Sequence, residues 1–197
     1  MMKVIGLAGR AGSGKSTVAR FLAQNPTIEW MDLDAVAWRT YASGTSVYDR
    51  LIDVFGRDIL NDAGEIDRAR LARSAFATPK LRQTLDKLVH PAVSDAIKAI
   101  ICSHKGKETQ ILLIEGALLA SSPYVDRSVY HAILWLETSD DARSKRLRAA
   151  GRGAHVDRSR DVTPVGDVVV VSGEGAVEAV ADRILTAIAE IPGPRSR

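Results

Sequence analysis

The sequence has little of several features that define specialised classes of protein. It contains one cysteine, Cys102, which excludes an internal disulfide and a cysteine-based zinc cluster and makes a reducing cytoplasm the expected setting. Aromatic residues make up only 5%, and no apolar run approaches the ~20 residues of a membrane-spanning helix. The first residues also lack the apolar segment of a secretory signal. We therefore expect a cytoplasmic protein without a membrane partner.

The overall composition is that of an ordinary globular domain. The 197 residues are 46% hydrophobic and 26% charged, and a chain of this length buries roughly 70% of its unfolded surface without a metal or disulfide. We expect a single domain over residues 1–197. Basic residues exceed acidic ones by only 27 to 24, and no aromatic–basic binding motif accompanies this excess. Nucleic acid is therefore not an expected partner, and the sequence does not specify an oligomeric state.

Short apolar runs alternate with helical patterns along much of the chain. Runs typical of buried parallel strands occupy residues 3–8, 27–31, 111–114, 132–136 and 168–171. Helical spacing of apolar residues covers 15–23, 140–148 and 176–191. This alternation predicts an α/β fold with a parallel sheet covered by helices on both faces.

Two segments interrupt the alternation. Residues 35–104 carry helical apolar stripes almost throughout, so we expect a helical insertion on the sheet-based core over about residues 42–108. Residues 151–166 are polar, rich in arginine and weakly patterned. They predict a short, arginine-rich lid over about residues 149–166.

A glycine-rich motif lies between the first predicted strand and the first predicted helix. Residues 9–16 read GRAGSGKS and fit G-x-x-x-x-G-K-[ST] at every fixed position. Glycines let successive backbone N–H groups point at phosphate oxygens, and the following helix adds its positive dipole end. The motif predicts a P-loop NTPase fold that binds ATP and Mg²⁺, with Lys15 between the β- and γ-phosphates and the Ser16 hydroxyl on the metal. The expected ATP-binding residues are Gly9, Ala11, Gly12, Ser13, Gly14, Lys15, Ser16 and Thr17.

Carboxylates follow two of the predicted strands. Asp32 and Asp34 come at the end of the second strand, and Glu115 follows the third. The carboxyl ends of strands face the ligand crevice in open α/β sheets, so an aspartate there can accept the proton of an attacking hydroxyl or hold Mg²⁺ through water. Alternatively, Asp34 caps a helix that starts near Ala35. Glu115 either supports the metal ligands or marks a strand-to-loop boundary.

Basic residues gather before and within the predicted lid. Taken together they fit an arginine clamp on a transferring phosphoryl group, whereas each one alone is typical of a solvated helix face. We expect Arg146 to act in catalysis and Arg148 to bind ATP. The basic set comprises Arg143, Lys145, Arg146, Arg148, Arg152, Arg158 and Arg160.

A separate signal lies in the predicted helical insertion. His90 is followed by Pro91, and this pair suggests a helix that starts at the proline.

An ordered set of motifs across residues 5–119 resembles one family, the dephospho-coenzyme A kinases. Asp32-Leu33-Asp34 is similar to the family's Asp-Ala-Asp motif. Residues 55–71 are similar to its F-G-x-x-I-L…G-x-L-D-R-x-x-L stretch, residues 88–91 to its L-x-H-P, and residues 115–119 to its D-x-P-L-L. The loop motif is shared by many NTPases, but the whole ordered set is far more specific.

The resemblance implies ATP-dependent phosphorylation of the ribose 3′-hydroxyl of dephospho-coenzyme A, the last step of coenzyme A synthesis, on a nucleoside-monophosphate-kinase-like fold. It implies that Asp34 is the base and that Arg68 and His90 lie on the substrate side, where we also expect Asp32 and Glu115. The family's Arg-Ile-x-x-Gln lid element is missing between residues 151 and 166. The alternatives are therefore a kinase of another small-molecule hydroxyl, such as a nucleoside or sugar, and a catalytically silent nucleotide-binding protein.

Overall fold

The computed structural model describes residues 2–104, 108–116, 119–120, 125–152 and 162–192. The chain divides into two compact units, Met1–Leu33 with His104–Arg197, and Asp34–Ser103. The first unit is discontinuous in sequence, and the second is inserted into it. Among the described residues, no helix is both long and apolar enough to cross a membrane.

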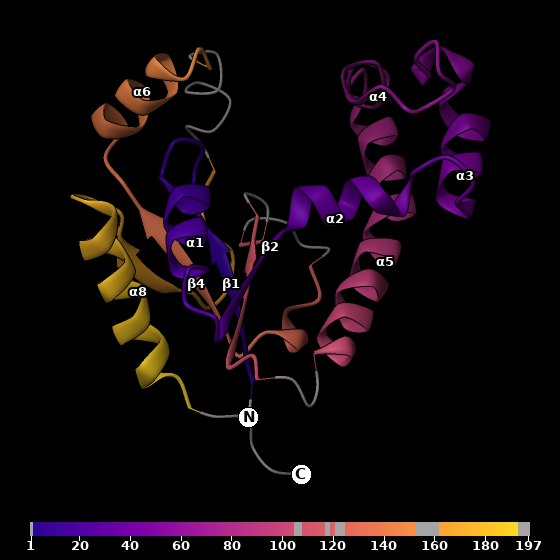
Figure 1. Cartoon of the computed structure of the whole chain (residues 1–197). Coiled ribbons are helices and arrows are strands. Elements are labelled where there is room, and N and C mark those ends of the chain that lie inside the picture. Colours follow the sequence, from indigo (N-terminus) through magenta and orange to yellow (C-terminus); the bar gives the residue numbers. More distant parts are fainter. Residues whose placement is uncertain (1, 105–107, 117–118, 121–124, 153–161, 193–197) are drawn as a thin grey trace. The chain divides into compact units, whose positions relative to one another are not determined.

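A five-stranded parallel sheet forms the centre of the first unit (Figure 1). Its strands follow the order β2-β3-β1-β4-β5, and all four neighbouring pairs are parallel. All five strands predicted from the sequence are present, so the predicted α/β sheet flanked by helices is confirmed. The expectation that every strand is buried is wrong for β5, an edge strand whose Val169 and Val170 are 40% and 62% exposed. Because parallel strands end at the same edge, the loop after β1 lies at the edge where β3 and β4 also end. The strands are β1 (Lys3–Ala8), β2 (Ile28–Asp32), β3 (Ile111–Glu115), β4 (Ala132–Glu137) and β5 (Val169–Ser172).

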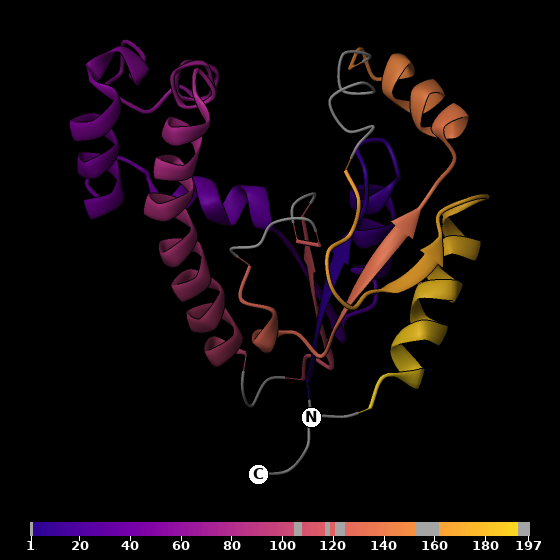
Figure 2. The ribbon, with the colours of Figure 1, turned by 180° about the vertical axis from the view of Figure 1, so that it is seen from behind.

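Two helices pack on the sheet through a shared apolar core. Helices α1 (Lys15–Leu22) and α8 (Val177–Glu190) contribute buried residues such as Val18 and Ile184, which pack with Leu134 of β4. Figure 2 shows β4 and β5 side by side with α8 next to them. The ammonium of Lys3 in β1 donates to the carbonyl oxygens of Ile188 and Ile191, both at 2.7 Å. This contact ties the first strand to the end of the last helix.

The remaining described elements of the first unit lie before and after β4 in the sequence. Helix α6 (Asp140–Ala149) comes directly after β4, and the 3-10 turn η2 (Arg127–Val129) comes directly before it. Ser139 caps α6 by accepting a hydrogen bond from the backbone of Ala142. The predicted lid over residues 149–166 continues from α6, but its residues 153–161 lie outside the described residues.

The second unit is helical and has a core of its own. Its elements are α2 (Leu33–Thr40, whose first residue belongs to the first unit), α3 (Ser46–Phe55), the 3-10 turn η1 (Arg57–Ile59), α4 (Arg68–Ala75) and α5 (Pro79–Ser103). The Asp67 side chain caps α4 by accepting the backbone N–H groups of Ala69 and Arg70, and these bonds lower the pKa of its carboxyl. This cap fixes the start of α4 at Arg68. The buried core residues are Val47, Leu51, Ile59, Ile66, Leu71 and Leu88.

Two local predictions are wrong. No helix starts at Pro91, because Pro91 lies inside the 25-residue helix α5; a proline removes one backbone donor, and the turns on either side keep theirs. Asp34 does not cap a helix that starts near Ala35, because α2 already begins at Leu33 and Asp34 lies in its first turn. A carboxylate there interacts with the positive end of the helix dipole.

Candidate active site

The loop between β1 and α1 has the tightly curled backbone that a phosphate-binding loop needs. Gly9, Gly12 and Gly14 have φ angles of 150°, 78° and 96°, a range that favours glycine. A Cβ on Gly12 would come within 2.9 Å of the Arg143 carbonyl oxygen, and one on Gly9 within 2.7 Å of the Leu136 carbonyl oxygen. The backbone of β4 and α6 therefore lies so close to the loop that neither Gly9 nor Gly12 could carry a side chain.

Lys15, which is only 7% exposed, folds back over this loop. Its Nζ donates to the carbonyl oxygens of Gly9 and Arg10 at 2.9 and 3.1 Å, and lies 3.5 Å from Ser13 Oγ. The ammonium is thus held within the same loop whose backbone the motif predicts to bind phosphate. The position of Lys15 between the β- and γ-phosphates stays a prediction.

Two residues predicted from the sequence to belong to the site, Ser16 and Glu115, are in direct contact at the carboxyl edge of the sheet. Ser16 Oγ donates to Glu115 Oε1 at 3.0 Å, and Glu115 is 6% exposed. Asp32 is aligned with Glu115 in the register of β2 and β3. Hydroxyl and carboxylate oxygens suit Mg²⁺. Within the described residues no group of three or more His, Cys, Asp or Glu side chains could by itself hold a metal ion.

A series of charged contacts connects the loop to the end of β4 and the start of α6. Arg10 donates to Glu137 Oε1 at 2.5 Å and to Asp140 Oδ1 at 3.2 Å. Arg143 donates to the same Asp140 oxygen at 2.5 Å, and its Nε donates to the Ala11 carbonyl at 2.8 Å. These contacts therefore begin at Arg10 of the loop and end at Ala11 of the same loop.

Sequence reasoning missed the role of Arg143. Its place among arginines and lysines suggested a solvated helix face or a clamp on phosphate. The side chain is instead 1% exposed, and its Nε donates a hydrogen bond to the Ala11 carbonyl. The signal that could have found it is weak: α6 has one leucine, Leu147, and Arg143 lies one turn before it on the same face.

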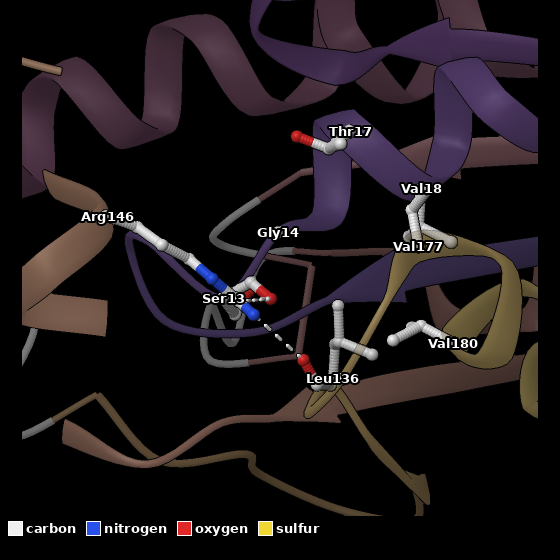
Figure 3. A pocket seen from close by; sticks show the side chains of 10 residues that line it. Ser13, Gly14, Thr17, Val18, Leu136, Arg146, Val177 and Val180 are labelled. Atoms are coloured by element: carbon white, nitrogen blue, oxygen red, sulfur yellow. Dashed lines mark hydrogen bonds between the residues drawn. The ribbon is translucent and has the colours of Figure 1, made fainter. Parts of the chain in front are cut away.

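A pocket of about 210 Å³ adjoins the loop (Figure 3). The guanidinium of Arg146 crosses it, donating to the Ser13 carbonyl at 3.1 Å and to the Gly173 carbonyl at 3.3 Å. A Cβ on Gly173 would lie 2.3 Å from Thr138 Oγ1, so that wall also requires glycine. Arg148 is exposed, and its side chain makes no hydrogen bond to the residues that the structure describes. The lining residues are Ser13, Gly14, Thr17, Val18, Leu136, Arg146, Gly173, Gly175, Val177 and Val180.

The second unit brings Asp34 and Arg68 to one pocket of about 240 Å³. The Arg68 guanidinium lies over the Trp38 ring, 4.1 Å from its centroid. Tyr41 also lines the pocket, and burial raises the pKa of its hydroxyl, with Arg68 lowering it and Asp34 raising it. The Tyr41 hydroxyl therefore stays protonated at neutral pH and can donate a hydrogen bond there.

His90 does not line this pocket. Its Nε2 lies 3.6 Å from Asp86 Oδ1, one turn earlier on α5. Burial lowers the pKa of His90, and the neighbouring Asp86 carboxylate opposes that shift. The imidazole is therefore neutral at physiological pH. Of the three residues expected on the acceptor side of this unit, the structure brings together Asp34 and Arg68.

The sequence of the chain matches a known family of enzymes. A sequence profile described as dephospho-CoA kinase matches residues 3–156. The chain belongs to the dephospho-CoA kinase family. It is therefore a kinase, a phosphotransferase that acts on a hydroxyl group.

Relatives of this family align over most of the chain. The dephospho-CoA kinase of Corynebacterium diphtheriae is 37% identical over 146 residues, covering 74% of this chain and 72% of that protein. The dephospho-CoA kinase of Methylococcus capsulatus is 32% identical over 197 residues, covering 93% and 95%. Among solved structures, TT1252 from Thermus thermophilus has a TM-score of 0.78 at 27% identity, covering 98% and 99%. Shikimate kinase from Acinetobacter baumannii, with a TM-score of 0.53 at 16% identity, shares the fold.

Proposed function

We propose that this chain transfers the γ-phosphate of ATP to the ribose 3′-hydroxyl of dephospho-coenzyme A. The observation that carries the proposal is the phosphate loop, in which the Lys15 ammonium is folded inward and the Ser16 hydroxyl is held by Glu115. A loop of this form offers one cation and one metal ligand to the β- and γ-phosphates. When ATP binds, Lys15 exchanges loop carbonyls for phosphate oxygens.

Ser16 and Glu115 fit a magnesium ion. The hydroxyl would bind the ion directly, and the carboxylate would orient that hydroxyl or bind through water. When bound, Mg²⁺ supplies positive charge that offsets the charge of the β- and γ-phosphates. Asp32, which ends the adjacent strand, would contribute a further carboxylate at the same edge.

The pocket beside the loop supports binding of the ATP base. Thr17, Leu136 and Val177 line it, and it adjoins the loop at Ser13 and Gly14. Arg146 donates to the carbonyls of Ser13 and Gly173, so we assign it the role of fixing the spacing between the phosphate and base subsites while its charge favours the transferring phosphoryl group. The assignment of Arg148 to ATP binding rests on its position in the sequence near the lid.

Asp34 is our candidate for the base that accepts the proton of the acceptor hydroxyl. Phosphoryl transfer needs a group that orients the attacking oxygen and takes its proton late in the reaction. Asp34 shares its pocket with the guanidinium of Arg68, which suits a phosphate group of the acceptor, and with the hydroxyl of Tyr41, a hydrogen-bond donor. His90 would contribute a neutral imidazole on the acceptor side.

A phosphotransfer panel tests the proposal. The purified protein is incubated with Mg-ATP and dephospho-coenzyme A, a nucleoside or a sugar, and the products are identified by mass. We expect one phosphate to be added to dephospho-coenzyme A and the reaction to stop with excess chelator. Phosphate on a nucleoside or sugar instead would favour a kinase of another hydroxyl, and ATP binding without any transfer would indicate a silent nucleotide-binding protein. We expect the cytoplasm as the compartment of this reaction.

A further inference from the structure

Phe76 is an aromatic side chain left largely in water. It follows the last turn of α4 and is 62% exposed, whereas its neighbour Ala75 is fully buried. The Arg82 guanidinium lies over the ring, 5.6 Å from its centroid. Single exposed apolar residues are common on protein surfaces, so exposure alone assigns nothing to Phe76. Its position in the lining of a pocket is what indicates a role.

Phe76 lines the same pocket as the candidate base. Arg68, Leu71 and Ala72 line it from one face of α4, and Phe76 lines it from the C-cap position of that helix. At 1.5 Å per residue, Arg68 at the start of that face and Phe76 at its end are about 12 Å apart along the helix axis. The pocket therefore has a charged end on α4 at Arg68 and an apolar, aromatic end at Phe76.

We infer that the Phe76 end of this pocket binds the adenine base of the acceptor. The inference rests on the proposed function, in which Asp34 receives the proton of the ribose 3′-hydroxyl. The base is attached to the ribose that carries the reacting hydroxyl, whereas the pantetheine arm is separated from that ribose by the diphosphate. With the hydroxyl at Asp34, the base is the apolar group that is confined to the neighbourhood of this pocket.

The chemistry of the apolar end suits a purine more than a flexible chain. An aromatic side chain stacks on the flat face of a base, and a guanidinium beside it, here that of Arg82, adds a cation–π contribution. Leu71 and Leu85 provide apolar walls. At the other end, the fork of Arg68 matches phosphate oxygens, which follow the ribose on its 5′ side.

The first experiment measures steady-state kinetics of Phe76→Ala, Phe76→Tyr and Val54→Ala. Loss of a stacking partner is expected to raise the KM for dephospho-coenzyme A roughly 10- to 100-fold and to leave the KM for ATP unchanged. Phe76→Tyr keeps the ring and should restore the acceptor KM. Val54, which is 43% exposed in the same unit and does not line the pocket, is the matched control and should leave both constants unchanged.

The second experiment separates the base from the pantetheine arm. AMP, which keeps base, ribose and phosphate, and 4′-phosphopantetheine are each tested as competitors of dephospho-coenzyme A at saturating ATP. We expect Phe76→Ala to raise the inhibition constant of AMP by the same factor as the acceptor KM and to leave that of 4′-phosphopantetheine unchanged. The reverse pattern, or an unchanged acceptor KM, overturns the assignment of the base to Phe76. Failure of the unmodified enzyme to phosphorylate dephospho-coenzyme A would instead contradict the proposed function.

Discussion

The two units prepare their charged side chains in different ways. In the first unit, Lys15, Arg143 and Arg146 already donate to backbone carbonyls of the loop or its surroundings, so the loop is held in one form before a ligand arrives. In the second unit, Arg68 is exposed and rests on the ring of Trp38. The difference indicates that the nucleotide side is preorganised, whereas the acceptor side exposes the guanidinium of Arg68. Substitutions in the two units should therefore affect different kinetic constants.

The largest effect should come from Lys15→Ala. It removes the cation that the loop presents to the β- and γ-phosphates, so we expect turnover to fall by about 1000-fold with the fold intact. Turnover and the thermal midpoint are measured together. Lys145→Ala removes an equal charge from an exposed position on α6 and is the control. Near-normal turnover of Lys15→Ala would contradict the role of the loop.

Asp34→Asn should come next. The change keeps the size of the side chain but removes the negative charge that accepts the proton, so turnover should fall by roughly 100-fold with the KM for ATP unchanged. Asp34 lies in the first turn of α2, so some stability is also lost, typically about 0.3–1 kcal/mol. Asp32→Asn is the paired variant, since one aspartate should dominate. A stable and fully active Asp34→Asn enzyme would remove the proposed mechanism.

Arg143→Gln sharpens the comparison on the nucleotide side. Without the guanidinium, the contact to Asp140 is lost and the Ala11 carbonyl loses its charged donor, so the loop is no longer held from outside. We expect the KM for ATP to rise about 10-fold, as for the loss of one charge-assisted hydrogen bond, and the acceptor KM to stay the same. Lys145→Ala again serves as control. Equal increases in both constants would mean that Arg143 acts only on overall stability.

Arg68→Ala should have the smallest effect and the opposite selectivity. It removes one exposed guanidinium from the acceptor pocket, so we expect the KM for dephospho-coenzyme A to rise about 5-fold and the KM for ATP to stay unchanged. Arg68→Lys keeps the charge but loses the planar group that lies over Trp38, and it should recover only part of the affinity. An increase in the KM for ATP would break the division between the units.

Much of the first unit could be predicted because its signals are local. Strands buried on both faces appear as short apolar runs, and the loop motif specifies backbone geometry through its glycines and the lysine beside them. The alignment of Asp32 with Glu115 in the register of β2 and β3 also agrees with the expectation that strand ends meet at one edge.

Features that depend on distant parts of the chain could not be predicted. The buried Arg143 finds the acceptor for its Nε–H in the Ala11 carbonyl, 132 residues away in sequence. The requirement for glycine at position 173 comes from Thr138, which no local pattern connects to it. Pro91 suggested a helix start because local rules say nothing of the flanking turns of α5, which hold the helix together around it. The apolar pattern groups Phe76 with the buried Leu71 and Ala75, but the side chain is 62% exposed and lines a pocket, which local spacing does not predict.

The discontinuity of the first unit has a consequence for synthesis on the ribosome. β1 lies at the centre of the sheet, yet its partners start only at Ile111 in β3 and Ala132 in β4. While the chain emerges, the nucleotide-binding motif has no sheet to join, whereas Asp34–Ser103 is continuous and already contains its own core. Domains usually form from the N-terminus onward during translation. Here the inserted helices can fold first. The first strand can complete its contacts only after the last part of the chain has been synthesised, because the carbonyl partners of Lys3 belong to Ile188 and Ile191.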